Sequence, residues 1–214
     1  MYNDFIEMIK PTCEMLYFIS SLIVAYAAIS ALKQIRVMEK SISIQSKRDA
    51  LKTSSDQCLY YMSEIIKLQN ELSEEIDGKG VSFLKKWNVE VKGNDIQLKH
   101  EGPVDRQEFI KLLQCDFPKA FNPMEAFATY FVSKVADENI AFKTVGKTYV
   151  YTVEKYIPLL LRLSENGHYH NILQLYILWK NRFESIELQN QIQKNQKNLE
   201  KCIVKTIRPV GTDF

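Results

Sequence analysis

A run of 18 residues without charge, proline or glycine lies near the start of the chain, at residues 15–32 (MLYFISSLIVAYAAISAL). An α-helix rises roughly 1.5 Å per residue, so this run is long enough to span about 27 Å, close to the thickness of a bilayer's hydrocarbon core. The run therefore predicts one membrane anchor, bounded by Glu14 and Lys33. Its large predicted lipid-facing residues are Met15, Leu16, Tyr17, Phe18, Leu22, Ile23, Val24, Tyr26, Ile29 and Leu32.

Three other structures compete with the membrane anchor. A cleaved signal peptide would find a small-residue site at Ala25-Tyr26-Ala27, but it needs a basic N-terminal region. Here residues 1–14 carry three acidic side chains against Lys10. A buried core helix is also compatible with 18 residues, which is the low end of the spanning range. An amphipathic surface helix would need a charged face, which this run does not have. The composition favours the transmembrane helix.

Basic residues follow the anchor and predict its orientation. Lys33, Arg36 and Lys40 come directly after it, and Lys47 and Arg48 lie slightly further on. Short segments rich in Lys and Arg stay on the cytoplasmic side of a membrane. We therefore expect residues 1–14 to form a short external N-terminus and residues 33–214 to lie in the cytoplasm.

Small residues on one face of the anchor suggest that it self-associates. Ser21, Ala25 and Ala28 share a helical face, and Ala27 and Ala31 are four residues apart. Small side chains at such spacing let two helices approach closely in a membrane. The alternative is that Ser and Ala are merely tolerated in lipid.

The composition favours helices and gives no sign of a nucleic-acid-binding protein. There are 28 basic and 26 acidic residues, a net charge of +2, and only 7 Gly and 6 Pro. So small an excess of positive charge gives no general attraction to nucleic acid. The four cysteines are far apart in the sequence, which fits free thiols in a reducing cytosol better than a disulfide framework or a zinc site.

The fold class expected after the anchor is mainly α. The apolar periodicity continues without Gly or Pro to Gly78, which predicts a long juxtamembrane helix over residues 33–77. Residues 78–185 are expected to form a helical bundle in the cytoplasm, which this long helix joins. Alternation on both sides of a turn at Gly93 predicts one small β-hairpin near residues 88–99. Residues 186–214 are expected to form a polar helical tail.

Local signals predict where the helices of the bundle begin. Asn122-Pro123 is expected to open one helix, because Pro fits the first turn. Asp137 and Glu138 are expected at the start of a short helix that Gly146 separates from the next one. The last long helix is expected to begin at His168 or Tyr169.

Several short motifs resemble those of a bacterial and phage family of membrane-anchored helical proteins of unknown function. The residues that carry the resemblance are Phe121-Asn122-Pro123-Met124-Glu125-Ala126-Phe127-Ala128, Asp137-Glu138, Tyr156-Ile157-Pro158 and Leu175-Tyr176-Ile177-Leu178-Trp179-Lys180-Asn181-Arg182. The resemblance covers about residues 15–185, without the hairpin. It implies a helical fold in a bacterial inner membrane and a role linked to phage or defence, but no known activity.

Residue types that carry chemistry are sparse. Glu125 and Arg182 lie in otherwise apolar helical stretches and are expected to form a buried ion pair between two helices. His168 and His170 form a His-x-His pair, but residues two apart on a helix face different directions, so no metal site is expected. The sequence contains neither GxxxxGK[ST] nor GxGxxG, so no phosphate loop, catalytic residue or cofactor is predicted.

The sequence thus predicts a membrane-anchored interaction or scaffold protein rather than an enzyme. Its expected partners are the lipid bilayer and either a second copy or an unknown cytoplasmic protein. One alternative is a membrane-tethered hydrolase that uses Glu125, Asp137 and Glu138. Another is that the lysines near the C-terminus bind anionic lipid or nucleic acid; nucleic acid is not the expected partner.

Overall fold

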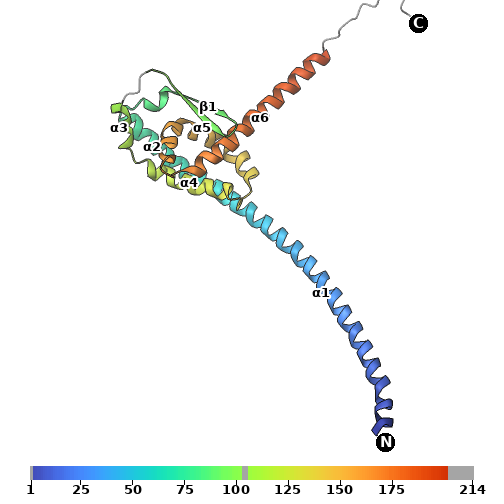
Figure 1. Cartoon of the computed structure of the whole chain (residues 1–214). Helices are drawn as coiled ribbons and strands as arrows, with labels where there is room; N and C mark the ends of the chain where they lie inside the picture. Colours follow the sequence, from blue (N-terminus) through green and yellow to red (C-terminus); the bar gives the residue numbers. More distant parts are fainter. Residues whose placement is uncertain (1, 103–105, 202–214) are drawn as a thin grey trace, which may run out of the picture. The chain divides into compact units, whose positions relative to one another are not determined.

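The structure is a computed structural model that describes residues 2–102 and 106–201 (Figure 1). It divides into two compact units, Met1–Ala50 and Leu51–Phe214, which are treated separately below. The helices are α1 (Tyr2–Tyr60), α2 (Ile66–Gly78), α3 (Arg106–Leu113), α4 (Phe117–Val132), α5 (Glu138–Ser164) and α6 (His170–Lys201), and the strands are β1 (Trp87–Lys92) and β2 (Asp95–His100). The described part of the chain is therefore mainly α-helical with one hairpin, as predicted.

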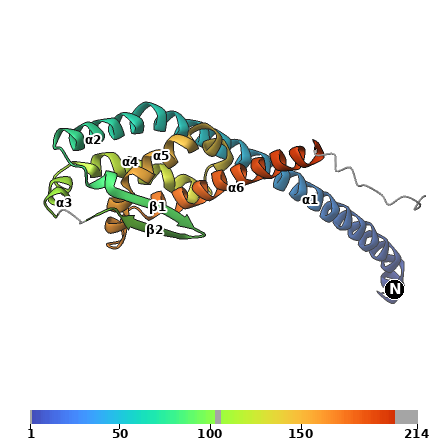
Figure 2. The ribbon, with the colours of Figure 1, turned by 90° about the horizontal axis from the view of Figure 1, so that it is seen from above.

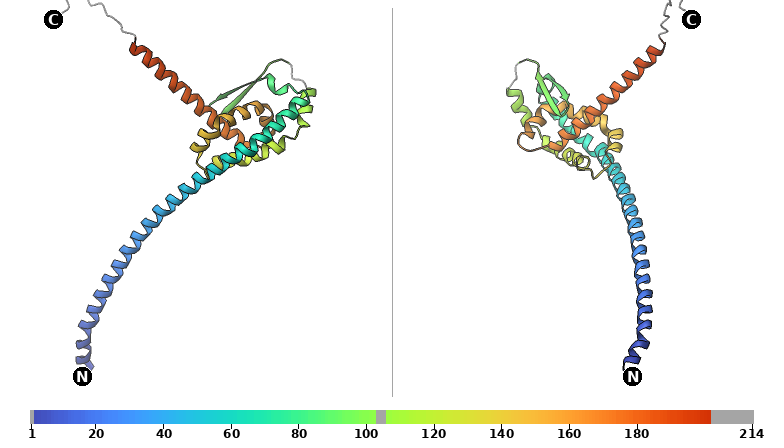
Figure 3. Two further views of the ribbon diagram at one scale, coloured as in Figure 1. Left: turned by 180° about the vertical axis from the view of Figure 1, so that it is seen from behind. Right: turned by 45° about the vertical axis from the view of Figure 1, so that its right-hand side comes forward.

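The described part of the first unit is a single helical segment, residues 2–50 of α1. It is continuous in all views of the ribbon (Figure 3). Side chains described between Glu14 and Asp49 are exposed almost throughout, with Ser30 the partly covered exception. None of the side chains described in this unit covers the apolar run.

In the second unit the long helix continues through a π-helical turn, Tyr61–Ile65, into α2. Its buried side chains recur every three or four residues, as expected for a helix with one face against a core. They are Ser54, Cys58, Tyr61, Ile65, Gln69, Leu72 and Ile76. The helical segment that was predicted to continue to Gly78 is thus present. Its second half, from Leu51, belongs to the compact body.

The predicted hairpin is confirmed. β1 and β2 pair antiparallel, with Val89 opposite Leu98 and Val91 opposite Ile96. Gly93 adopts a φ of 63° as the first residue of the two-residue turn, which is typical of a type II′ turn. The apolar face of the strands packs against the core, and Figure 2 shows the hairpin and α2 on opposite sides of α4 and α5.

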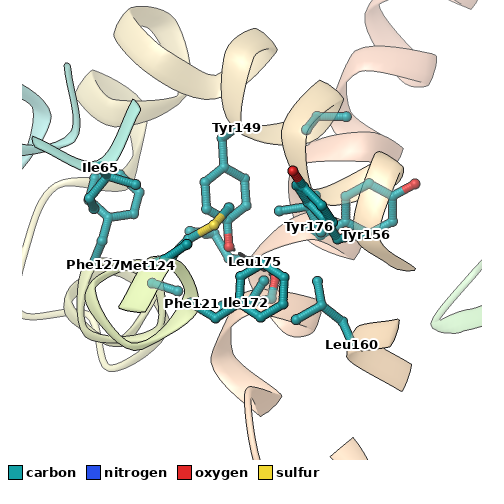
Figure 4. Packing of buried hydrophobic residues seen from close by; sticks show 14 of the residues in the cluster. Ile65, Phe121, Met124, Phe127, Tyr149, Tyr156, Leu160, Ile172, Leu175 and Tyr176 are labelled. Atoms are coloured by element: carbon teal, nitrogen blue, oxygen red, sulfur yellow. Dashed lines mark hydrogen bonds between the residues drawn. The ribbon is translucent and has the colours of Figure 1, made fainter. Parts of the chain in front are cut away.

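Helices α4, α5 and α6 enclose a core rich in aromatic side chains (Figure 4). Trp179 of α6 is fully buried, with its ring centroid 5.0 Å from that of Tyr149 in α5. The Tyr149 hydroxyl donates a hydrogen bond to the Ile172 carbonyl at 3.0 Å, so this buried polar atom is satisfied. The core thus links the last two helices by packing and by a hydrogen bond.

Two predicted helix boundaries are wrong. Helix α4 begins at Phe117, so Pro123 lies inside it rather than at its start. Helix α5 runs unbroken across Gly146, which is buried. A Cβ at Gly146 would lie 3.2 Å from Phe142 Cδ2 and 3.5 Å from Phe183 Cζ. This glycine therefore gives room for two aromatic rings between α5 and α6, and it does not end a helix.

The last helix begins at His170, close to the predicted start. Gly167 and Tyr169 both have positive φ, 85° and 60°, so the chain reverses direction just before α6. Beyond Phe183 the described side chains of α6, at 184–200, are exposed. This exposed part agrees with the polar helical tail expected from residue 186, as far as the structure describes it.

Candidate functional site

The predicted anchor is the most unusual surface of the chain. One described helix, near the N-terminus, is long and apolar enough to cross a membrane, and none of its apolar window is buried. Tyr17, Leu22, Val24 and Tyr26 expose between 68% and 75% of their surface. A core helix or a signal sequence can satisfy the same length and composition. The surface is far more apolar than the isolated exposed residues that soluble proteins carry.

Two serine hydroxyls inside this run are satisfied within the helix. Ser20 Oγ donates to the Tyr17 carbonyl at 2.8 Å, and Ser21 Oγ donates to the Phe18 carbonyl at 2.7 Å. A hydroxyl without a partner costs several kcal/mol in hydrocarbon. The two serines are therefore compatible with lipid and need no neighbouring helix for their hydrogen bonds.

The basic residues that predict orientation are also on the surface. Lys33, Arg36 and Lys40 are all exposed on the same helix as the apolar run. Ser21, Ala25 and Ala28, the candidate residues for helix association, are exposed as well. Nothing described in the first unit covers either set.

The predicted ion pair between Glu125 and Arg182 is not formed. Glu125, in α4, instead accepts hydrogen bonds from the backbone amides of Asn171 at 3.1 Å and Ile172 at 2.9 Å, and from Asn171 Nδ2 at 2.9 Å. These amides belong to the first turn of α6, whose N–H groups have no partner within the helix. Glu125 therefore caps a neighbouring helix, and its negative charge faces the positive end of the α6 dipole.

Arg182 pairs with Glu138, the first residue of α5. Its Nη1 lies 3.0 and 2.9 Å from the two carboxylate oxygens, and Nη2 donates to Asn139 Oδ1 at 2.6 Å. Trp179 Nε1 donates to the same carboxylate at 2.6 Å, and the guanidinium lies 4.1 Å from the centre of the Phe142 ring. An ion pair between helices is thus present, but sequence reasoning named the wrong acid.

The three carboxylates of the hydrolase alternative are held by separate structural contacts. Glu125 caps α6, while Glu138 binds Arg182 and Trp179. Asp137 Oδ1 accepts from the amides of Asn139 and Ile140, which confirms the predicted acidic start of α5. Each of these carboxylates therefore acts as a helix cap or as an ion-pair partner.

Two open grooves on the body were not predicted. One, of about 960 Å³, lies between the turn of the hairpin and α6, with Ile96, Phe131, Leu173 and Ile177 in its lining. Another, of about 430 Å³, is lined by Phe83, Trp87, Phe109 and Pro158, with Arg106 and Arg162 beside them. Their linings come from segments far apart in the chain, so no local sequence pattern would have indicated them.

Residues suited to metals or thiol chemistry do not assemble into a site in the described part of the chain. There, no three His, Cys, Asp or Glu side chains gather closely enough to hold a metal ion. Cys58 and Cys115 are free and buried, and desolvation raises the pKa of both thiols. Cysteines in such surroundings are weak nucleophiles.

Comparisons of the chain with protein-family models, curated proteins and solved structures found no match. The resemblance to a bacterial and phage family therefore stays a prediction, and the functional argument depends on the geometry of the chain itself. That geometry has two parts: an exposed apolar helix with a basic flank, and a helical body in which Glu125, Asp137, Glu138 and Arg182 form helix caps and an ion pair.

Proposed function

We propose that this chain is a single-pass protein of a bacterial inner membrane, and that its helical body is a cytoplasmic interaction module. The body would bind a protein partner or a second copy, as a scaffold fixed at the membrane. Its pathway, linked to phage or defence, is proposed from the family resemblance alone.

The observation that carries the proposal is the exposure of every large apolar side chain of the helix at residues 15–32. Eleven large apolar side chains in this run are exposed by 44–75%, and smaller Ala and Ser residues lie between them. Burying a side chain of this size contributes about 1.5–3 kcal/mol, so leaving the whole set in water would forgo well over 10 kcal/mol. A bilayer covers all faces of one helix at once, and the length of the run matches its hydrocarbon core.

Charge supports the proposed orientation. Lys33, Arg36 and Lys40 follow the run directly, whereas the acidic residues Asp4, Glu7 and Glu14 dominate the other side. Because Lys and Arg near a span are retained on the cytoplasmic side, this charge distribution supports a cytoplasmic body. Cys58 and Cys115, free in the structure, are compatible with that reducing compartment.

An interaction role is supported by the chemistry of the body. Glu125, Asp137 and Glu138, the carboxylates of the hydrolase alternative, are engaged in helix caps and an ion pair. The two apolar grooves, by contrast, provide surfaces of the kind that binding partners use. We therefore favour binding over catalysis.

The test is fractionation of the full chain expressed in bacteria. The wild-type chain should stay in the membrane pellet after a carbonate wash, and a C-terminal tag should resist protease added outside spheroplasts. The variant that carries both Ile23→Arg and Val24→Arg should no longer sediment with the membranes, because each charge costs about 2.5–3.5 kcal/mol at mid-membrane. Leu188→Arg with Ile192→Arg, on the exposed end of α6, is the matched control and should stay in the pellet. Release of the wild-type chain by carbonate would refute the proposal.

A further inference from the structure

A second apolar feature of α1 extends beyond the anchor. Val24, Ala28, Ala31, Ile35, Met38 and Ile42 are spaced alternately by four and three residues, the heptad spacing of a coiled coil. At about 100° per residue they share a sector of roughly 80° on the helix. We call this set the seam. Ile35, Met38 and Ile42 are exposed by 53%, 64% and 61%.

Lipid does not account for the cytoplasmic end of the seam. If Leu32 marks the edge of the hydrocarbon core, Met38 and Ile42 lie about 9 and 15 Å beyond it along a helix. The headgroup layer on one side of a bilayer is only roughly 5–8 Å thick. Ile42 therefore lies in water unless another protein surface covers it, and no described residue of the first unit does so.

Charges are arranged so that two copies can meet along the seam. Lys33, Arg36, Lys40 and Lys47 all fall within roughly 60° on the opposite face of the helix. The positions beside the seam pair favourably in a parallel dimer: Gln34 of one copy lies opposite Glu39 of the other, and Ser41 lies opposite Ser46. No like charges therefore meet across the seam, which ends at Ile42 because Gln45 and then Asp49 take its next positions.

We infer that the chain forms a parallel homodimer through the seam, with Ile35, Met38 and Ile42 packed against the same residues of a second copy. This inference depends on the proposed membrane anchor, because two copies inserted with one orientation hold their seams at the same depth. Ala28 and Ala31 let the helices approach closely in lipid, and the bulky residues fill the interface in water. A partner with a different sequence would have to reproduce both this depth and this spacing.

The test compares two double variants of the full chain that each remove two exposed apolar side chains. Ile35→Asn with Ile42→Asn changes the seam, whereas Val37→Asn with Ile44→Asn changes residues exposed by 70% and 45% on the basic face. Energy transfer between donor- and acceptor-labelled copies in liposomes reports association. We expect the wild type and the basic-face variant to associate equally, and the seam variant to bind at least tenfold more weakly.

A cross-linking experiment tests the register. In a chain carrying Cys13→Ser and Cys202→Ser, Ile42→Cys should form a disulfide-linked dimer under mild oxidation, and Ile44→Cys should not. Equal cross-linking at both positions, equal effects of the two double variants, or a monomeric wild type in liposomes would each overturn the inference. A chain that carbonate releases from membranes would instead overturn the proposed anchor, so the two failures can be told apart.

Discussion

At the scale of single residues, acidic side chains in the body stabilise helix ends. Asp137 caps its own helix, whereas Glu125 reaches from α4 to the first turn of α6. A carboxylate that accepts backbone N–H groups satisfies donors that the helix cannot pair and interacts favourably with the helix dipole. The start of α6 is therefore held by a side chain that lies 46 positions earlier in the sequence.

Glu125→Gln should destabilise the fold. Glutamine keeps one acceptor oxygen but presents an NH₂ group to one of the two amides and removes the negative charge. The free energy of unfolding should fall by about 1–3 kcal/mol, measured by denaturant unfolding of the full chain in detergent with tryptophan fluorescence. Glu187→Gln, at an exposed position of α6, should stay within about 0.5 kcal/mol of wild type. Equal midpoints for the wild type and Glu125→Gln would refute the capping role.

Tyr156 should make stability depend on pH under alkaline conditions. Burial raises the pKa of its hydroxyl to about 12. The unfolded-state pKa is about 10, so the folded state retains a proton that the unfolded state loses. This contribution to stability is complete below pH about 10 and is lost as the pH rises towards 12.

Tyr156→Phe removes that titration. Between pH 9 and about 11.5, the free energy of unfolding should fall less steeply with pH for Tyr156→Phe than for the wild type. The difference in slope should be at most that of one bound proton. Denaturant unfolding at a series of pH values measures it. Parallel curves for the two proteins would show that Tyr156 ionises with an ordinary pKa in the folded state.

At the scale of elements, the contact between α5 and α6 depends on the missing side chain of Gly146. Phe142 and Phe183 lie against this position, with ring centroids 4.4 Å apart. The same two helices are joined by the ion pair of Glu138 and Arg182. Aromatic packing and a charged pair thus hold one interface.

Gly146→Val should disrupt that interface. The added Cβ already lies 3.2 Å from Phe142, and the two methyl groups of Val would displace the rings. Overpacking of this kind costs about 1–3 kcal/mol, measured as a loss in the free energy of unfolding. Gly78→Val is the control, since a Cβ there meets no atom within 4 Å. An unchanged stability for Gly146→Val would mean that α5 and α6 can separate without cost.

At the scale of the whole molecule, the proposed topology depends on a short basic flank. Replacing Lys33, Arg36, Lys40, Lys47 and Arg48 by Gln leaves Lys10, on the other side of the anchor, as the nearest positive charge. A substantial fraction of chains should then insert with the body outside, because Lys and Arg near a span determine its orientation. Protease sensitivity of a C-terminal tag in spheroplasts measures that fraction.

The control for this change removes charge elsewhere. Lys194→Gln with Lys197→Gln alters the exposed end of α6, far from the anchor in sequence, and should leave the tag protected. If the flank variant is also fully protected, the orientation has a different cause, such as early folding of the body.

Features that depend on neighbouring residues were predictable from the sequence alone. The apolar helix at residues 15–32, the hairpin around Gly93 and the acidic cap at Asp137 each follow from composition, alternation or a side chain that reaches its own backbone. These features depend on residues that are close together in the sequence, so a local pattern is enough to predict them.

Features that join distant elements were decided only by the tertiary structure. Glu125 and Arg182 were both expected to be buried charges with partners; both are only partly buried, and which partner each takes depends on how α4, α5 and α6 pack. Glycine often marks the end of a helix, yet Gly146 lies within one and makes room for the close packing of two aromatic rings. The physical reason is the same in both cases: the favourable energy comes from groups tens of residues away, and only the packed helices place those groups within reach.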